Sequence, residues 1–559
     1  MKKKLSILIL VLVMGMSMVQ GQTTVTPATV GAANLTGVTS LTVTGSWNDS
    51  NLGTLKNKLI TAKATLTTVN MSAATLTGDI SNGFNDMFSF FGKLMNLTLP
   101  SARHSSQVSF AQTFYSCSSL KSVDLSGFMN ITKMSDTFSN CSSLTSVKLP
   151  VSNIYDGSVA FGSAFLGCSA LESIDLSGFS NIGDLWSAFN GCGKLTSVKL
   201  PANNVSTNAV LFSNTFSGCS ALKSVDLSGF SNIYTMDFAF LNCSNLTSVK
   251  LPVWNTSASA ISFSNAFRGC ASLESIDLSG FSRISSVLNA FDSCSELIAV
   301  FLGDVPPNYY ADAFTGANPG CVKFVGREGF DNTGYNWTNV VLSSADGTAS
   351  AIPDEMTHLA LCEGAEWNNA ALTNLSKTLQ VFVDKTELKE VNFSGIIFAV
   401  EGITTGFAGM FKNFESLSEI LFPPGEYNKP VSFNKTFSGC SALASIDISM
   451  FTNISDVTDA FQNCATLTSL FLGSVPANNY ADAFTGANAN CVKFVGKTDF
   501  NNGGYNWTNV IVPAVKSGKV THIALYEGTE WGNDALANLG AALRNSAIER
   551  YLKKNAPKK

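Results

Sequence analysis

Residues 216–233 read FSGCSALKSVDLSGFSNI, and nearly the same text stands 51 residues earlier, at 165–182 (FLGCSALESIDLSGFSNI), and 51 residues later, at 267–284 (FRGCASLESIDLSGFSRI). Self-similarity at a fixed period is the signature of a chain built from stacked structural repeats. A chain of 559 residues also exceeds one ordinary hydrophobic core. We therefore expect a repeat array rather than a globular domain with a single core.

The cysteines define the length of one repeat. Ten of the twelve steps between the thirteen Cys alternate between 24 and 27 residues, and the exceptions are the two steps that flank Cys362. A disulfide framework has no reason to keep such a regular spacing. The Cys stand at positions 117, 141, 168, 192, 219, 243, 270, 294, 321, 362, 440, 464 and 491. This spacing predicts one Cys at the same inward place of each coil, as a small buried filler with a free thiol.

Alignment on Cys reveals one template, F-x-x-C-x-x-L-x-x-[VI]-x-L, in eight copies from Phe114 to Leu302, and two more copies, which begin at Phe437 and Phe461, keep its apolar pattern. Its last part alternates apolar and polar residues as a short strand does. One such strand buries too little surface to fold alone, so each coil must cover the Leu, Val, Phe and Cys of the next, with strands parallel at about 4.8 Å. We expect Leu171, Leu195 and Leu222 to lie side by side in the interior.

Charges alternate in sign at the outward position seven residues after each Cys. Neighbouring parallel strands would place opposite charges side by side, which disfavours a slip of one coil, although each exposed pair is worth only about 0–1 kcal/mol. The same row is a candidate binding face; a solvated sheet face without a ligand is an equally good interpretation. The row comprises Asp124, Lys148, Asp175, Lys199, Asp226, Lys250 and Asp277.

Longer recurring segments mark the ends of blocks. Residues 301–340 and 471–510 are nearly identical and rich in Pro, Gly, Asn and aromatic residues, as expected of caps. Trp47, Trp367 and Trp531 are each followed by Leu at offsets of 5, 8 and 12, which predicts three short helices. We predict a first block at 22–345, a second at 346–512, and a partial third unit at 513–559 with a strand and an amphipathic helix, which either docks on the preceding cap or has lost its continuation.

The N-terminus predicts export. Lys2, Lys3 and Lys4 precede an apolar run at 5–13, and small residues at 19 and 21 suit cleavage after Gly21, so 1–21 is predicted to be a signal peptide. No later apolar run approaches the roughly 20 residues that span a bilayer. Removal of the three lysines leaves 32 basic and 40 acidic residues, a net charge of −8. This composition, with 13% charged residues, does not suit a nucleic-acid binder.

The coil, preceded by Ala-Phe in copies such as 188–189 and 266–267, resembles the BspA-type leucine-rich repeat over about 110–302 and 433–473. The resemblance implies a right-handed leucine-rich-repeat solenoid of the α/β repeat class, strand-rich with short parallel strands and few short helices, here in two solenoid blocks. It also implies a secreted or cell-surface protein of a host-associated bacterium that binds host or microbial proteins. The alternating coil lengths and longer loops, such as 151–165, depart from the family's coil of about 23 residues.

Three functions remain open. The first is an exported protein that binds a protein or glycan on a host or microbial surface, with Tyr155 and Trp254 in variable loops as candidate contacts. The second is a structural spacer in a surface or secreted assembly. An enzyme is disfavoured, because the three His and the Asp row form no convergent cluster and no catalytic, cofactor or metal motif occurs. We predict no cofactor, and the sequence leaves the oligomeric state open.

Overall fold

Phe side chains stacked from coil to coil form the centre of the fold. The computed structural model describes residues 21–302, 311–325, 335, 337–344, 356–361, 366–473, 481–495, 507–516, 519–525 and 531–544. The chain divides into two compact units, residues 1–273 with 285–294 and residues 274–284 with 295–559. In the first unit the rings from Phe88 to Phe291 stack with centroids 5.2–5.8 Å apart. The predicted stacking of coils is confirmed.

The first unit begins with a cap. Strands β1 (Gln22–Val25), β2 (Ser40–Trp47), β3 (Thr68–Leu76) and β4 (Asn96–Thr98) form one parallel sheet, joined by η1 (Val30–Ala32), α2 (Asp49–Leu59) and η2 (Ile60–Ala62). Asn48 starts α2, since its side chain accepts from Asn51 N at 3.0 Å while the Asn51 side chain accepts from Asn48 N at 2.8 Å. The predicted stripe of Leu52, Leu55 and Leu59 is fully buried.

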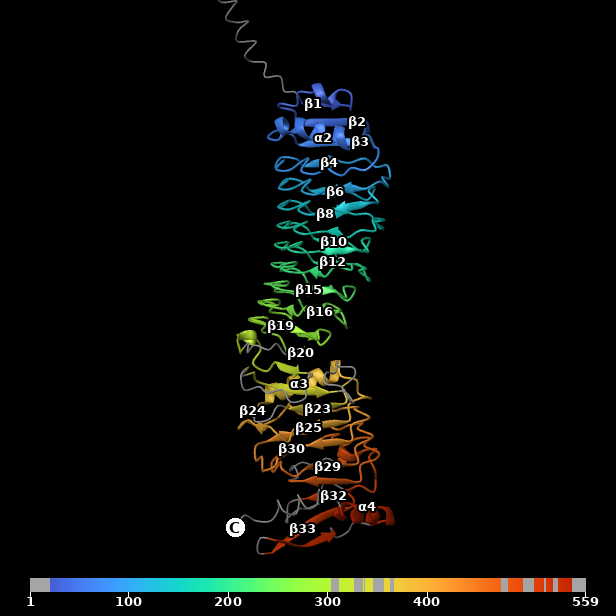
Figure 1. Ribbon diagram of the computed structural model, residues 1–559. Coiled ribbons are helices and arrows are strands. Elements are labelled where there is room, and N and C mark those ends of the chain that lie inside the picture. The colour runs from blue at the N-terminus through green and yellow to red at the C-terminus, as the bar shows by residue number, and fades with distance from the viewer. Residues whose placement is uncertain are drawn as a thin grey trace, which may run out of the picture. The chain divides into compact units, whose positions relative to one another are not determined.

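Each coil after this cap carries two very short strands, and the coils of the first unit stack one below the next (Figure 1). One row is the predicted one. It comprises β6 (Ser122–Asp124), β8 (Ser146–Lys148), β10 (Ser173–Asp175), β12 (Ser197–Lys199), β14 (Ser224–Asp226) and β16 (Ser248–Lys250). The other row comprises β5 (Val108–Ser109), β7 (Ile131–Lys133), β9 (Val159–Ala160), β11 (Ile182–Asp184), β13 (Val210–Leu211), β15 (Ile233–Thr235), β17 (Ile261–Ser262) and β19 (Ile284–Ser286).

A strip of stacked turns holds the coils together on the side of the Phe rings. The N–H groups of residues 112, 114 and 116 donate to carbonyls of the next coil at 2.7–2.9 Å, while those of 113, 115 and 117 donate three residues back within their own coil at 3.0–3.1 Å. This alternation requires left-handed backbone at Gln112 and Ser116, whose φ angles are +56° and +58°. Gly, Asn and Ser fill most equivalent places, because they tolerate that conformation best.

The cysteines are free thiols, as predicted, and they also act as donors. All twelve Cys in the described residues are buried, and none of them forms a disulfide. From Cys117 to Cys294 each Sγ donates to the carbonyl of the Phe one coil earlier, at 2.9–3.1 Å. Leu171, Leu195 and Leu222 are fully buried beside them. Cys362 lies outside the described residues.

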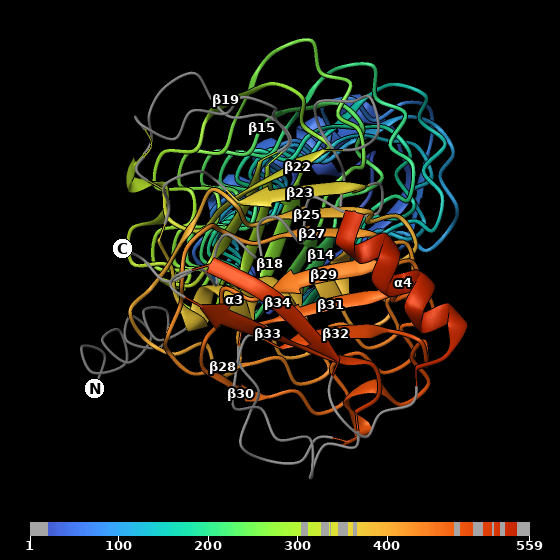
Figure 2. The same cartoon turned by 90° about the horizontal axis from the view of Figure 1, so that it is seen from below.

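The second unit repeats this design with a longer sheet (Figure 2). One sheet has the order β18-β20-β21-β22-β23-β25-β27, and another has the order β29-β31-β32-β33-β34. The first sheet contains β18 (Ser275–Leu278), β20 (Ala299–Leu302), β21 (Val322–Val325), β22 (Val340–Ser344), β23 (His358–Leu361), β25 (Glu390–Asn392) and β27 (Glu419–Leu421). The second contains β29 (Ser445–Ile448), β31 (Ser469–Leu472), β32 (Val492–Val495), β33 (Val510–Lys516) and β34 (Lys519–Leu525).

Shorter elements complete the second unit. They are η3 (Ala311–Phe314), β24 (Glu366–Trp367), α3 (Asn369–Phe382), β26 (Ile397–Phe398), β28 (Val431–Ser432), β30 (Ile454–Asp456), η6 (Ala481–Phe484) and α4 (Asn533–Arg544). The predicted stripe of α3, Leu372, Leu375 and Leu379, is fully buried. That of α4 is not, because only Leu539 packs on the core, which includes Phe471, while Leu536 is 45% exposed. Helix α4 thus packs on this core through Leu539 and Ala542, and the partial third unit remains a prediction.

The recurring cap segment does not end the sheet. Antiparallel pairing of β22 with β23 (341–344 with 358–361) carries the sheet from the last coil of the first predicted block to the start of the second. β33 and β34 pair in the same antiparallel way in the second copy. The cap thus covers its own coil and also offers an edge to the next strand. The predicted block boundaries remain predictions, and residues 1–20 of the predicted signal peptide lie outside the described residues.

Candidate functional site

The predicted charge row exists, but its members pair in twos. Strand β6 pairs in register with β8, β10 with β12, and β14 with β16, each as a separate two-stranded sheet across a 24-residue step. The Lys Nζ to Asp Oδ2 distance is 3.6 Å in the first pair and 3.5 Å in the other two. The pairs are Asp124 with Lys148, Asp175 with Lys199, and Asp226 with Lys250.

Each Asp of this row also holds its own turn. Asp175 accepts from Ser177 N at 3.0 Å and from Ser177 Oγ at 2.5 Å. The hydrogen bond from the Ser177 hydroxyl is the largest cause that lowers the pKa of Asp175. Burial acts next and in the opposite direction, but the Ser177 N–H and Lys199 add to the lowering, so the pKa stays below its usual range. Asp277, in the second unit, accepts from Ser279 N at 2.8 Å and stands opposite Phe301 in the ladder, so the alternation of charges stops there. These contacts indicate a structural use of the row.

An Asn side chain anchors the longer loop of three coils in the first unit. Asn204 is 7% exposed; its Oδ1 accepts from Ile182 N at 2.7 Å and its Nδ2 donates to Ile182 O at 2.9 Å. Asn153 bonds Ile131 in the same way at 2.7 and 3.0 Å, and Asn255 bonds Ile233 at 2.8 and 3.1 Å. The Asn amide group thus satisfies the backbone N–H and C=O that a neighbouring strand would otherwise bond, at the place where the longer loop leaves the sheet. These two hydrogen bonds hold the base of the loop rigid.

Beyond these anchors the loops expose apolar side chains. Trp254 is 68% exposed, and Tyr155 is half-buried against Gly157. Sequence reasoning missed three neighbours: Val151, which is 95% exposed, Val205 and Val253. The sequence feature that could have identified these loops is Leu-Pro-x-x-Asn, which recurs every 51 residues at 149–153, 200–204 and 251–255. Because these loops recur every second coil, they follow one another at roughly 10 Å along the first unit.

Two bulky residues occupy left-handed positions in the turn strip. Phe90 (φ +64°) and Phe238 (φ +57°) are both exposed. Left-handed backbone costs a residue with a side chain roughly 1–2 kcal/mol, whereas an exposed cation–π contact like that of Lys63 over Phe90 gains about 0.5–1 kcal/mol. The Lys63 contact by itself therefore does not offset the strain; the edge-on Tyr115 ring, with its centroid at 5.1 Å, is a second contact of Phe90. Sequence reasoning missed both residues; a Phe in a column of Gly, Asn and Ser was the available signal.

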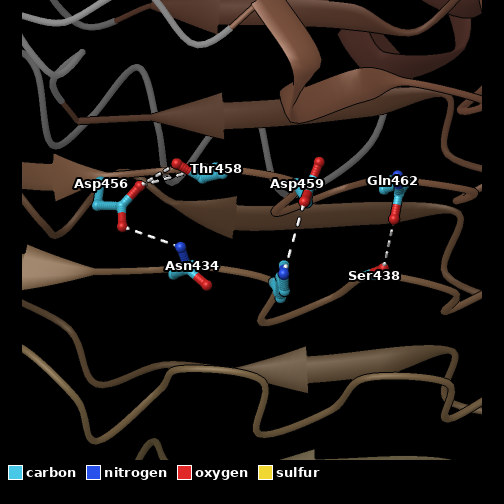
Figure 3. Close-up of polar contacts among 7 residues, drawn as sticks. Asn434, Ser438, Asp456, Thr458, Asp459 and Gln462 are labelled. Atoms are coloured by element: carbon cyan, nitrogen blue, oxygen red, sulfur yellow. Dashed lines mark hydrogen bonds and ion pairs between the residues drawn. The ribbon is translucent and has the colours of Figure 1, made fainter.

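The corresponding strip of the second unit carries polar contacts between adjacent coils (Figure 3). Asp456 accepts from Thr458 N at 2.8 Å and from Asn434 Nδ2 at 3.1 Å. Partial burial acts to raise the pKa of Asp456, but these hydrogen bonds outweigh it and the pKa is lowered. Lys435 pairs with Asp459 at 3.9 Å. Since each polar group is already partnered, we assign this strip to coil alignment.

Two buried lysines occupy equivalent places after η3 and η6. Lys323 Nζ donates to Cys321 O and to Thr338 O, both at 2.9 Å, and lies 4.7 Å from the ring centroid of Phe314. Lys493 repeats the arrangement at 2.9 and 3.1 Å. Burial lowers the pKa of both lysines. The sequence did not predict their burial, because a single Lys in an otherwise apolar strand is normally expected to point into solvent.

The described residues show no group of three or more His, Cys, Asp or Glu that could hold a metal ion. His104 is buried next to Phe128, and His358 faces Glu390 at 3.7 Å and Thr357 at 2.8 Å. Among the helices of the described residues, none has the length and apolar character that crossing a membrane demands.

Comparison with protein families finds one match. The model of the BspA type leucine-rich repeat region matches residues 56–163, 135–266, 213–319 and 380–492, about two thirds of the chain. No curated protein matches the chain.

Solved structures with leucine-rich repeats are similar at low identity. A leucine-rich cell surface protein of Faecalibacterium prausnitzii is 20% identical, over 64% of this chain and 80% of that one, with a TM-score of 0.25. The ectodomain of the receptor kinase GASSHO1/SCHENGEN3 of Arabidopsis thaliana is 16% identical, over 88% of this chain and 54% of that one, with a TM-score of 0.27.

Proposed function

The chain belongs to the BspA-type leucine-rich-repeat family, and from this premise we propose that it is an exported surface protein that binds a protein partner on the loops of its 27-residue coils. The observation that carries the proposal is the series of three anchored loops in the first unit, each held by an Asn side chain and each presenting exposed apolar side chains. Variable side chains on rigid bases are the usual form of a binding surface.

The loop surface, defined as Val151, Tyr155, Val205, Val253 and Trp254, has the composition expected of an interface. Binding energy concentrates in a few large side chains such as Trp and Tyr, surrounded by smaller apolar residues that exclude water. The charge row supports the proposal less, since its Asp and Lys already satisfy each other. Adhesion to host matrix or to other microbes is the role that we propose for this surface.

The alternative is a spacer without a specific ligand. The spacer alternative predicts that replacing loop residues leaves attachment to other surfaces unchanged. The binding proposal predicts that the same replacements weaken attachment. The exposed Trp254 favours binding, because a spacer gains nothing from an apolar side chain that is 68% exposed.

The test uses the purified protein against immobilised extracellular-matrix extract, mucin and cells of neighbouring bacteria. A Tyr155→Ala/Trp254→Ala double variant should lose at least about tenfold in retention, as hot-spot residues do, at an unchanged melting temperature. Tyr234→Ala, which removes an exposed aromatic outside the loops, is the matched control and should be retained like the wild type. Equal retention of the double variant, or no retention of the wild type on any surface, would leave the spacer as the better account.

A further inference from the structure

An open hollow of about 530 Å³ lies beside the N-terminal cap of the first unit. Its walls include Ile60 and Lys63 from the end of the cap helices, and Phe90 and Lys93 from the first coil. Ligand sites generally fall within about 300–1,000 Å³. The hollow is far in sequence from the loop surface, whose members begin at Val151.

Phe90 departs from its column in the turn strip. Equivalent left-handed places in the following coils hold Ser116, Asn140 and Gly167. Phe90 is the bulky exception, and it is 55% exposed despite contacts with Lys63 and with the Tyr115 ring at 5.1 Å. A strained backbone with an exposed aromatic ring is typical of a binding position rather than of packing.

Among the residues that the structure describes, the two lysines of the hollow have no carboxylate partner. Within the described part of the chain, no ion pair within 4 Å involves the ammonium group of Lys63 or of Lys93, and none of the residues that line the hollow is acidic. The protein as a whole carries a net charge of −5. A local pair of unneutralised cations on an acidic protein favours an anionic ligand.

The apolar groups of the hollow indicate which class of molecule the anionic group belongs to. Ile60 is 68% exposed and aliphatic, while one face of the Phe90 ring is occupied by Lys63 Nζ, 4.5 Å from its centroid. A sugar ring stacks on an aromatic face, and Phe90 has at most one face left after the contact with Lys63, with the Tyr115 ring packed against it at 5.1 Å. An aliphatic or aromatic side chain needs only Ile60 and the edge of the ring.

We propose that this hollow binds an acidic peptide segment of a partner protein, with a Glu or Asp carboxylate held between Lys63 and Lys93 and an adjacent apolar side chain against Ile60 and Phe90. The site is separate from the loop surface and does not depend on the role proposed for it.

The test is isothermal titration calorimetry of the purified protein with the acetylated, amidated peptide Leu-Glu-Leu-Glu-Leu. The matched control peptide has Gln in place of both Glu, and an oligogalacturonate tests for an acidic glycan. The Glu peptide should bind at least about tenfold more tightly than the Gln peptide, and Phe90→Asn and Lys63→Met should each weaken it at least about tenfold. Phe238→Asn relieves the same backbone strain at a distant place and should bind like the wild type.

Melting temperatures keep the test independent of folding. Phe90→Asn and Phe238→Asn should both melt at or above the wild-type temperature, because Asn adopts left-handed backbone more readily than Phe. Equal affinity for the two peptides, no heat at about 1 mM peptide, an unaffected Phe90→Asn variant, or tighter binding of the oligogalacturonate would overturn the proposal. Trp254→Ala should leave peptide binding unchanged, so failure here is distinct from failure of the loop surface.

Discussion

Replacing Asn204 by Ala should loosen one loop base and destabilise the first unit. The change removes the donor and the acceptor that satisfy Ile182 N and O at 2.7 and 2.9 Å, and Asn204 is only 7% exposed, so water has little access to either group. Each buried backbone group left without a partner costs about 1–3 kcal/mol. We expect the free energy of unfolding to fall by about 2–5 kcal/mol.

Asn255 provides the internal control. It makes the same two bonds to Ile233 at 2.8 and 3.1 Å but is only half-buried, so water can replace it. Asn255→Ala should therefore cost only about 1 kcal/mol. Urea unfolding followed by circular dichroism measures both losses, and native-state hydrogen exchange of the Ile182 amide locates the first. If the two variants lose the same free energy of unfolding within about 0.5 kcal/mol, burial of the Asn does not determine how much the anchor contributes to stability.

Three further outcomes follow from packing and charge. Burial raises the pKa of Cys141 to about 12 from an ordinary 9.0. Between these two pH values the folded state keeps a proton that the unfolded state loses, so the free energy of unfolding should decline as the pH rises from 9 to 12. Urea titrations at several pH values measure the decline, which should be less steep in Cys141→Ala. Gly178→Ala would place a Cβ 2.2 Å from the Pro150 carbonyl oxygen and should cost more than about 2 kcal/mol by urea unfolding, whereas Gly127→Ala, whose nearest atom lies at 3.5 Å, should be tolerated. Lys199→Ala breaks an exposed ion pair and should shift the unfolding free energy by less than about 1 kcal/mol; a larger loss would mean that the charge row sets the register.

The repeat architecture was predictable because it depends on residues that recur. A Phe, a Cys and two Leu at fixed offsets in every coil require an interior that continues from coil to coil, and the stacked rings from Phe88 to Phe291 confirm it. The helices after Trp47 and Trp367 were predictable for the same reason, since their Leu stripes have the helical period. The exposed loop residue Trp254 was also identified from its place in a variable connection.

The candidate sites depended on departures from the repeat, whose meaning lies in neighbours distant in sequence. No residue near Asn204 in the sequence indicates that its side chain bonds the backbone of Ile182, because that contact exists only once the two coils lie side by side. Likewise, Phe90 reads as one more core aromatic until the stacked turns place it in left-handed backbone, under Lys63 and open to solvent.

The sequence by itself determined the coil, its period and its buried residues, because burial of apolar side chains at a fixed spacing allows few other arrangements. Only the tertiary structure decided which polar and aromatic side chains are satisfied by a neighbouring coil and which remain available to a partner. That difference is set by contacts across coils 22 to 30 residues apart, which a pattern within one coil does not contain.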